Sequence, residues 1–176
     1  MQSPQIIRLE DLPPVPWRNG LGSTRVIAGS EPDAAWRLSV ADLTQDGDFS
    51  SFEGWDRTFC VYGQSPVELT VAGETRLLLP GQTLSFDGEA PVRAALPRGP
   101  SQALNLMTRR GSASGTIEVA ELGAGQALKP DVVAVAPLED AAGEGEQPLR
   151  HAQILLHPGG APAPGTPARV ALVRVS

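Results

Sequence analysis

Arginine and asparagine side chains recur inside otherwise apolar segments of this chain, and they offer the clearest potential for chemistry. Arg37 and Ser39 would share one face of an extended segment, because side chains alternate between the two faces of a β-strand. Asn105, Met107 and Arg109 would share one face of another segment for the same reason. Guanidinium and amide groups are costly to bury unless they find partners. The pattern therefore favours a pocket for an anionic or amide-bearing small molecule, since arginine binds carboxylates bidentately.

A second interpretation of these arginines is purely structural. Each of them could pair with an aspartate and tie a loop to the fold, and the sequence offers Asp42, Asp46, Asp48 and Asp56 for this purpose. For one arginine alone the ion pair is the simpler interpretation, whereas for the whole set a shared pocket competes with it.

Other kinds of site find little support in the sequence. The chain contains two histidines, His151 and His157, and no His-x-His pair, so we predict no metal site and no other cofactor. Its single cysteine, Cys60, lies between apolar neighbours, where an inert buried thiol is expected. No Gly-x-Ser-x-Gly motif is present, and no glycine-rich loop has the context of a nucleotide site. The sequence therefore favours a binding protein without catalytic residues over an enzyme.

Composition narrows the partners and the compartment. The 176 residues carry a formal net charge of -6, which argues against a nucleic-acid surface because phosphate binding requires a basic field. No apolar run approaches the roughly 20 residues of a membrane helix, and residues 1–5 lack the features of a secretory signal. A single cysteine is typical of a reducing compartment. We expect a cytoplasmic protein with a small-molecule partner and neither a nucleic-acid nor a membrane partner, and we also consider a homodimer.

Short β-rich segments separated by glycine and proline must position these side chains. The 19 glycines and 17 prolines mark tight turns, and no window of about 12 residues free of both carries a helical apolar stripe. The clearest alternation predicts a hairpin around Ala72-Gly73-Glu74, followed by Pro80-Gly81 and an apolar strand through Phe86. The predicted fold class is all-β, a sandwich or barrel. Strands are expected over Gln5–Leu9, Thr24–Ala28, Trp36–Asp42, Arg57–Tyr62, Val67–Val71, Thr75–Leu79, Pro91–Leu96, Gln102–Thr108, Thr116–Leu122, Val132–Ala136, Ala152–Leu156 and Arg169–Val175.

Aromatic residues are distributed unevenly along the chain. All eight of them lie between Trp17 and Phe86, so the rigid packing material belongs to the first half. Residues 139–146 and 157–168 are expected to form surface loops. We predict a first unit over residues 1–110 and a smaller β unit over residues 111–176 packed on it.

An ordered series of motifs between residues 17 and 110 resembles the HutD/Ves family. The resemblance implies a bicupin, in which double-stranded β-helix barrels of the cupin type are paired and the second is reduced. It also implies a cytoplasmic location, no established catalytic metal, binding of a formyl- or formimino-glutamate-like carboxylate, and a regulatory role in histidine utilization; Ves-like members are associated with cold stress instead. The series consists of Trp17-Arg18-Asn19-Gly20, Thr24-Arg25, Trp36-Arg37-Leu38-Ser39-Val40-Ala41, Asp46-Gly47-x-Phe49-Ser50-x-Phe52-x-Gly54-x-x-Arg57 and Asn105-Leu106-Met107-Thr108-Arg109-Arg110.

Eight residues on these motifs become candidates for ligand binding. Arg25, Arg37 or Arg57 could hold a carboxylate, and Asn19 and Asn105 offer both donor and acceptor to a formyl or formimino group. The full set is Trp17, Asn19, Thr24, Arg25, Arg37, Arg57, Asn105 and Arg109.

Three positions depart from the family pattern. Val26 and Ala103 stand where acidic residues are usual, and Leu21 interrupts the glycine-rich run after Asn19. The loss of two carboxylates weakens any role that needs a general base at these positions. The alternatives are a metal-independent cupin enzyme for a small polar metabolite, a Ves-like stress-related protein, and a β domain that binds other proteins.

Overall fold

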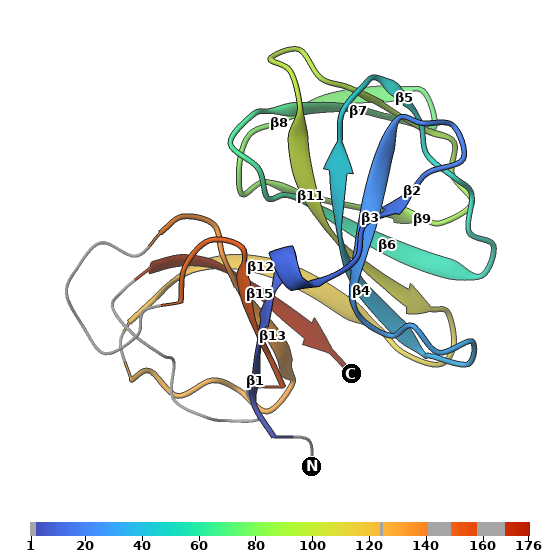
Figure 1. Cartoon of the computed structure of the whole chain (residues 1–176). Helices are drawn as coiled ribbons and strands as arrows, with labels where there is room; N and C mark the ends of the chain where they lie inside the picture. Colours follow the sequence, from blue (N-terminus) through green and yellow to red (C-terminus); the bar gives the residue numbers. More distant parts are fainter. Residues whose placement is uncertain (1–2, 124, 141–148, 158–167) are drawn as a thin grey trace. The chain divides into compact units, whose positions relative to one another are not determined.

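The computed structural model describes residues 3–123, 125–140, 149–157 and 168–176, which are built almost entirely from β-strands (Figure 1). One compact unit spans Pro13–Gly115, and a second combines Met1–Leu12 with Thr116–Ser176. The described residues contain no α-helix, and their one helical turn is the 3-10 helix η1, Leu9–Asp11. No helix in this part of the chain is long and apolar enough to cross a membrane. The prediction of an all-β fold is confirmed.

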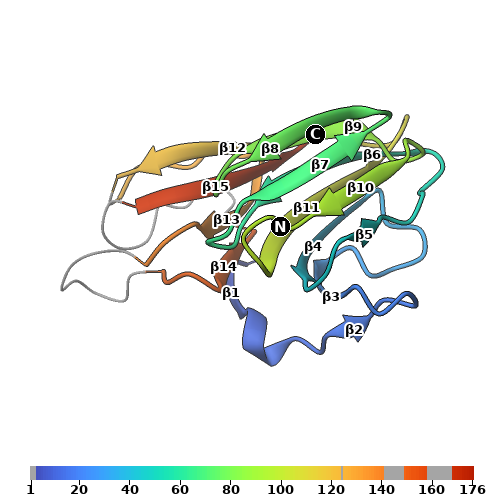
Figure 2. The ribbon, with the colours of Figure 1, turned by 90° about the horizontal axis from the view of Figure 1, so that it is seen from above.

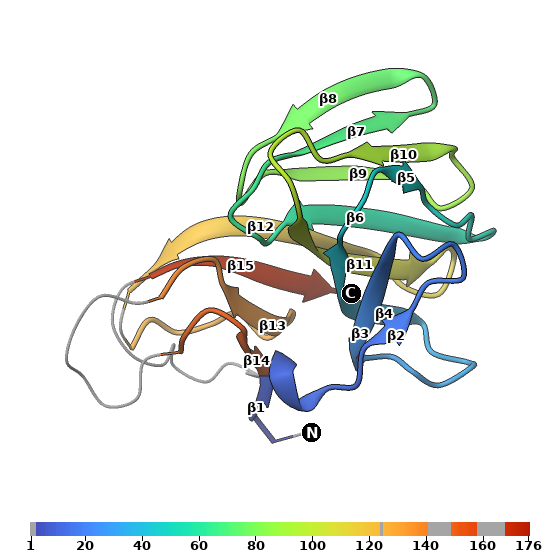
Figure 3. The ribbon, with the colours of Figure 1, turned by 45° about the horizontal axis from the view of Figure 1, so that its top comes forward.

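The Pro13–Gly115 unit consists of two antiparallel sheets that face each other (Figure 3). The six-stranded sheet has the order β2-β3-β4-β11-β6-β9, and the four-stranded sheet has the order β5-β10-β7-β8. The strands are β2 Val15–Pro16, β3 Gly22–Ala28, β4 Trp36–Leu43, β5 Gly47–Asp48, β6 Trp55–Val61, β7 Val67–Val71, β8 Glu74–Leu78, β9 Thr83–Asp87, β10 Val92–Ala95 and β11 Ser101–Arg109.

The core of this unit combines side chains from both sheets. Leu43 of β4, Phe59 and Val61 of β6, and Val67 and Leu69 of β7 are buried and belong to one apolar cluster. Burying a side chain of this kind contributes about 1.5–3 kcal/mol. Because each sheet turns one apolar face toward the other, the unit closes into a cupin-like barrel around a shared interior.

Strand register carries polar side chains into the same interior. β11 lies between β4 and β6, with Asn105 opposite Ser39 of β4, and with Met107 opposite both Arg37 of β4 and Arg57 of β6. These positions continue the alternation of the core residues on the same strands. The predicted sharing of faces, Arg37 with Ser39 and Asn105 with Met107, is therefore confirmed, and the shared face is the interior one.

The predicted hairpin is formed by β7 and β8, which run side by side in Figure 2. Val71 pairs with Glu74, so the loop between them has two residues, Ala72 and Gly73. Their φ angles are 47° and 88°, which is the left-handed pair required by a type I′ turn. Glycine adopts this conformation freely, whereas alanine adopts it at a cost.

The second unit contains one five-stranded sheet in the order β1-β14-β13-β15-β12, as far as its described residues go. β1 pairs with β14, so the N-terminal segment belongs with residues 116–176, whereas the predicted division had placed residues 1–110 together. Leu128, Val135, Leu155 and Leu172 belong to its apolar cluster. The interpretation of this unit as a reduced second barrel stays a prediction. The strands are β1 Gln5–Arg8, β12 Gly115–Leu122, β13 Val132–Pro137, β14 Gln153–Leu156 and β15 Ala168–Val175.

Each predicted strand segment overlaps an observed strand, and β9 is the apolar strand expected after Pro80-Gly81. The sequence did not indicate β2 and β5, because two residues each are too few to show an alternation. Of the two predicted surface loops, residues 141–146 and 158–167 lie outside the described residues.

Candidate functional site

A cavity of about 580 Å³ opens within the Pro13–Gly115 unit. Its walls come from β2, the turn that follows β2, β3, β4, the segment from β5 to β6, and β11. Aromatic rings, hydroxyl groups and guanidinium groups are all present in these walls. The cavity is lined by Val15, Pro16, Trp17, Arg18, Asn19, Thr24, Arg37, Ser39, Asp48, Phe49, Ser50, Phe52 and Met107.

Trp17 forms a fixed aromatic wall of the cavity. Its indole Nε1 donates a hydrogen bond to Thr24 Oγ1 at 2.8 Å, and its ring meets that of Phe49 edge-on at 5.9 Å between centroids. Gly22 makes this placement possible, because a Cβ at residue 22 would lie 2.4 Å from the carbonyl oxygen of Asp42 and 3.2 Å from the Trp17 ring. Partnered on its polar edge, the indole keeps one orientation and leaves its apolar face for packing.

Asn19 holds the turn at the rim of the cavity. Its Oδ1 accepts a hydrogen bond from the Leu21 backbone N–H at 3.1 Å, and its Nδ2 donates to the carbonyl oxygen of Asp48 at 3.5 Å. This is the local pairing by which asparagine stabilises turns. Leu21, one of the departures from the family pattern, packs against Gly47, where a Cβ would lie 1.9 Å from Leu21 Cδ1. Leucine at residue 21 therefore fills the space that glycine leaves at residue 47.

Arg37 brings an unneutralised cation into the cavity. It lines the wall beside Ser39 and opposite Met107, and no described residue forms an ion pair with it. Its Nε is buried without a hydrogen-bond partner. The acidic lining residue, Asp48, pairs instead with Arg93, at 3.2 Å between Nη1 and Oδ1. A guanidinium group in this setting can bind an anionic group of a ligand through two parallel N–H donors.

Arg57 lies behind the wall rather than in it. Its guanidinium carbon is 5.3 Å, 5.4 Å and 5.3 Å from the ring centroids of Phe49, Phe52 and Phe86, and the side chain is 8% exposed. Nη1 donates to the carbonyl oxygen of Ser50 at 3.4 Å, while Nε is buried without a partner. Desolvation by burial lowers the pKa of Arg57 to about 10, so the group stays charged at neutral pH.

Asn105 and Arg109 lie on β11 outside the cavity lining. Asn105 is 7% exposed, and its Oδ1 is buried without a hydrogen-bond partner. The Arg109 guanidinium lies 5.1 Å from the Trp55 ring centroid and donates to the carbonyl oxygen of Pro32 at 3.1 Å. Its Nε is buried without a hydrogen-bond partner, but Nη2 and the cationic face contact Pro32 and Trp55, neither of which lines the cavity.

Arg25 fulfils the structural interpretation of the arginines. It forms an ion pair with Asp42, whose carboxylate also accepts from Ser23 Oγ at 3.2 Å and Gln102 Nε2 at 2.7 Å. Thr24 and Arg25 are neighbours on β3, so their side chains leave opposite faces of the sheet, and only Thr24 reaches the cavity.

The two missing acidic residues fall on β3 and β11. Val26 lies opposite Ser39, and Ala103 lies opposite Ala41 and Val61 in the apolar core with no exposed surface. A carboxylate at residue 103 would be buried among apolar side chains, which is costly without a partner.

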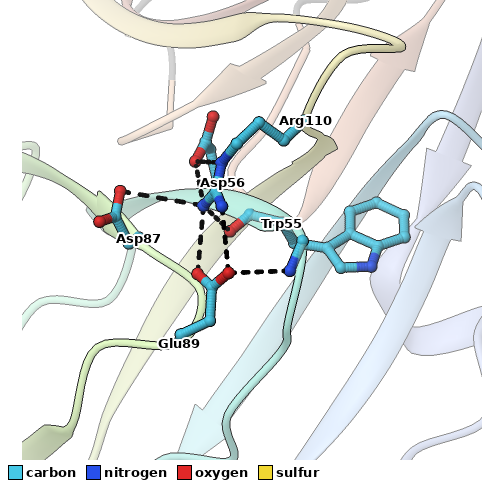
Figure 4. Close-up of polar contacts among 6 residues, drawn as sticks. Trp55, Asp56, Asp87, Glu89 and Arg110 are labelled. Carbon is cyan, nitrogen blue, oxygen red and sulfur yellow. Dashed lines mark hydrogen bonds and ion pairs between the residues drawn. The ribbon is translucent and has the colours of Figure 1, made fainter.

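A separate polar cluster ties the start of β6 to the turn after β9 (Figure 4). Arg110 donates to Asp56 at 2.9 Å and to Glu89 at 3.0 Å, and lies 3.9 Å from Asp87. Glu89 also accepts from the backbone N–H of Gly54 at 2.9 Å. The hydrogen bond from Arg110 lowers the pKa of Glu89 to about 2, and the same bonds raise the pKa of Arg110. These residues are exposed and do not line the cavity, so we assign the cluster a structural role, namely to hold these segments together.

The cavity brings together four of the eight sequence-predicted residues. Trp17, Asn19, Thr24 and Arg37 line it, whereas Arg25, Arg57, Asn105 and Arg109 do not. Sequence reasoning left out several lining residues, although Ser39 and Met107 share faces with candidates and the others stand in the quoted motifs or beside them. The residues left out are Val15, Pro16, Arg18, Ser39, Asp48, Phe49, Ser50, Phe52 and Met107.

Within the described residues, no group of three or more His, Cys, Asp or Glu side chains is arranged to hold a metal ion. The donors around the cavity are instead guanidinium, hydroxyl and amide groups, which suit an organic anion.

Comparison with known proteins places the chain in a family. The family model described as HutD matches residues 9–161. The chain belongs to the HutD family. An uncharacterised 21.2 kDa protein in the hutC 3′ region of Pseudomonas putida is 36% identical over 112 residues, or 61% of this chain and 59% of that relative. Protein Ves of Cronobacter sakazakii is 39% identical over 109 residues, or 60% of each chain. The matched regions thus span less than two thirds of the length of these relatives.

Two solved structures resemble almost the whole chain. HutD from Pseudomonas fluorescens SBW25, solved in a formate condition, is 31% identical with a TM-score of 0.81, covering 99% of this chain and 98% of that one. A conserved protein of unknown function from Pseudomonas aeruginosa PAO1 is 25% identical with a TM-score of 0.81, covering 99% of this chain and all of that one. The predicted resemblance to the HutD/Ves family is therefore confirmed.

Proposed function

We propose that this HutD-family protein binds a small carboxylate metabolite in the cavity, with Arg37 as the group that holds the carboxylate. The observation that carries the proposal is the state of Arg37: it lines the cavity, has no ion-pair partner among the described residues, and keeps Nε buried without a hydrogen-bond partner. A partly buried cation whose Nε has no partner is unfavourable, and a carboxylate would satisfy both its charge and its donors.

The rest of the cavity suits a small polar ligand. Its volume of about 580 Å³ falls within the usual range for small-molecule sites. Ser39 and Ser50 add hydroxyl groups to the lining, and Arg18 adds a second guanidinium that pairs with no described acidic residue. Trp17 and Phe52 add apolar surface to the same lining. A ligand with one carboxylate at Arg37 and a second polar group toward Arg18 would match this distribution.

The family suggests which carboxylates to consider. HutD of Pseudomonas fluorescens was solved in a formate condition, and formate is the smallest carboxylate. We propose a formyl- or formimino-glutamate-like ligand and a regulatory role in histidine utilization, exerted in the cytoplasm by a bicupin without a resident metal. Because the chain is also 39% identical to a protein Ves, a Ves-like stress-related role is the second candidate.

Calorimetric titration tests the proposal. The wild-type protein is titrated with formate, N-formyl-glutamate, formimino-glutamate, urocanate and histidine, and Arg37→Met is compared with Arg37→Lys. A hydrogen bond to a charged group contributes about 1.5–3 kcal/mol, so Arg37→Met should weaken carboxylate binding by about 10-fold or more. Arg37→Lys should retain part of the affinity because it keeps the charge without the fork.

The control variant is Arg98→Met, which removes an exposed arginine in the turn before Gly99, away from the cavity. It should bind as the wild type does. Absence of heat with every carboxylate up to millimolar concentration would refute the proposal. Unchanged affinity in Arg37→Met would show that Arg37 does not hold the carboxylate, and it would contradict that part of the proposal.

A further inference from the structure

We infer that Arg57, although it does not line the cavity, is a positioning residue that supports its aromatic wall and makes the cavity prefer anions to neutral ligands. The inference rests on the proposed function, since it concerns the ligand of the same cavity. It differs from the sequence-based hypothesis, in which Arg57 could hold a carboxylate by direct contact.

Most of the residues around Arg57 also line the cavity. Phe49 and Phe52 stack on its guanidinium at 5.3 Å and 5.4 Å, Ser50 accepts its hydrogen bond through the backbone, and Met107 lies opposite it on β11. These four residues all line the cavity. The Arg57 guanidinium therefore contacts the segment between β5 and β6, which forms no strand at residues 49–52. Its cation–π contacts hold the rings of Phe49 and Phe52 in place.

The charge of Arg57 has no counter-ion among the described residues. No carboxylate forms an ion pair with it, its Nε is without a partner, and 8% of the side chain is exposed. Aromatic faces stabilise a cation, but they do not cancel its field as an anion would. The positive potential of Arg57 therefore extends through the wall into the cavity.

The size of the effect follows from strand spacing. Arg57 on β6 and Arg37 on β4 are separated by β11, and two strand spacings amount to about 10 Å. A charge at about 10 Å changes the affinity for a monovalent anion by about 2-fold in a water-like dielectric and about 15-fold at an effective dielectric constant of 20. A neutral ligand of the same shape feels no such change. Loss of the wall, by contrast, would weaken both ligands alike.

Formate and formamide make the matched probe pair, because they share shape and differ in charge. Their affinities are measured by NMR titration of the indole N–H signal of Trp17 in the wild type, Arg57→Met, Arg57→Lys and Phe86→Leu. Phe86→Leu is the packing control, since Phe86 stacks on Arg57 at 5.3 Å but does not line the cavity. Arg57→Gln replaces Arg57→Met if the latter does not fold.

The expected result is a preference for formate over formamide that falls by about 2-fold to 15-fold in the neutral variant and is kept in Arg57→Lys and Phe86→Leu. An equal loss of both ligands in the neutral variant would reduce Arg57 to a support of the wall and overturn its inferred effect on anion preference. An unchanged preference with unchanged affinities would overturn both parts of the inference. A loss of the preference in Arg57→Lys would also overturn the inference, because a charge-based role requires the wild-type preference in that variant. Failure of the wild type to bind formate would instead contradict the proposed function, carboxylate binding in the cavity.

Discussion

Replacing Asn105 with leucine is expected to make the Pro13–Gly115 unit more stable. Asn105 is 7% exposed, and its Oδ1 is buried without a hydrogen-bond partner. Register places it in the barrel interior opposite Ser39 and Phe59. Leucine has nearly the same size and shape and carries no polar atom, so Asn105→Leu removes the unpaired acceptor without opening a cavity.

The magnitude follows from two opposing contributions. An unsatisfied buried polar group costs about 1–3 kcal/mol, and this cost disappears with the amide. Imperfect packing of the leucine side chain lowers the free energy of unfolding by about 1 kcal/mol. The net gain in the free energy of unfolding is therefore about 1 kcal/mol, which corresponds to a rise in Tm of about 2–4 °C for a chain of this length.

Urea unfolding and thermal melting measure the change, with Asn19→Leu as the matched control. The Asn19 amide accepts from Leu21 at 3.1 Å and donates to Asp48 at 3.5 Å, so the same substitution there removes made hydrogen bonds. Asn19→Leu should lose about 0.5–1.5 kcal/mol. One substitution applied to two asparagines is thus expected to act with opposite signs.

A loss of stability in Asn105→Leu of 1 kcal/mol or more, estimated as about the size of one hydrogen bond, would refute the reasoning. It would mean that the amide of Asn105 contributes a satisfied interaction. The same variant also locates the amide relative to the ligand. Weaker binding of N-formyl-glutamate would assign Asn105 to the ligand, as its amide chemistry led us to predict from the sequence, and unchanged binding would remove it from the site.

The hairpin turn and the Arg110 cluster carry the remaining predictions. Ala72→Asn should raise stability by about 0.5–1 kcal/mol, because asparagine tolerates the left-handed φ of 47° better than alanine, and a urea midpoint below that of the wild type would contradict this. The pKa of Glu89 is depressed from 4.5 to about 2, so its pairing with Arg110 stabilises the fold above pH 4.5 and is lost as the pH falls toward 2. The urea midpoint of the wild type should therefore exceed that of Glu89→Gln at pH 7 and approach it near pH 2; a constant difference across this range would contradict the assignment.

Strand positions and side-chain faces could be predicted because alternation is a local property. The face shared by Arg37 and Ser39 follows from two-residue periodicity, and β4 bears it out. The same rule separates Thr24 from Arg25, since adjacent residues on a strand point to opposite sides. We predicted both Thr24 and Arg25 as ligand residues because they are adjacent in the same motif. Strand geometry instead directs Arg25 to the other side of the sheet, where it pairs with Asp42.

The contribution of the segment between β5 and β6 could not be predicted in the same way. Phe49 and Phe52 reach the cavity and Arg57 from a stretch without regular periodicity, so no alternation indicates where their rings point. The same limit applies to Leu21, whose partner Gly47 is brought near by the pairing of distant segments. Such contacts depend on tertiary packing, to which a single sequence gives no direct access.

The uneven distribution of aromatic residues has a physical explanation in the cavity. A core made only of aliphatic side chains can pack without leaving a cavity, and the apolar cluster of the second unit consists of leucine, valine and alanine. An open cavity requires rigid side chains in its lining that do not collapse into the space, and Trp17, Phe49 and Phe52 are such side chains. The same rings solve a second problem, because π-faces stabilise the buried charge of Arg57 without neutralising it. The unit that contains all the aromatic residues is therefore the unit in which an unneutralised cation can be kept beside an open cavity.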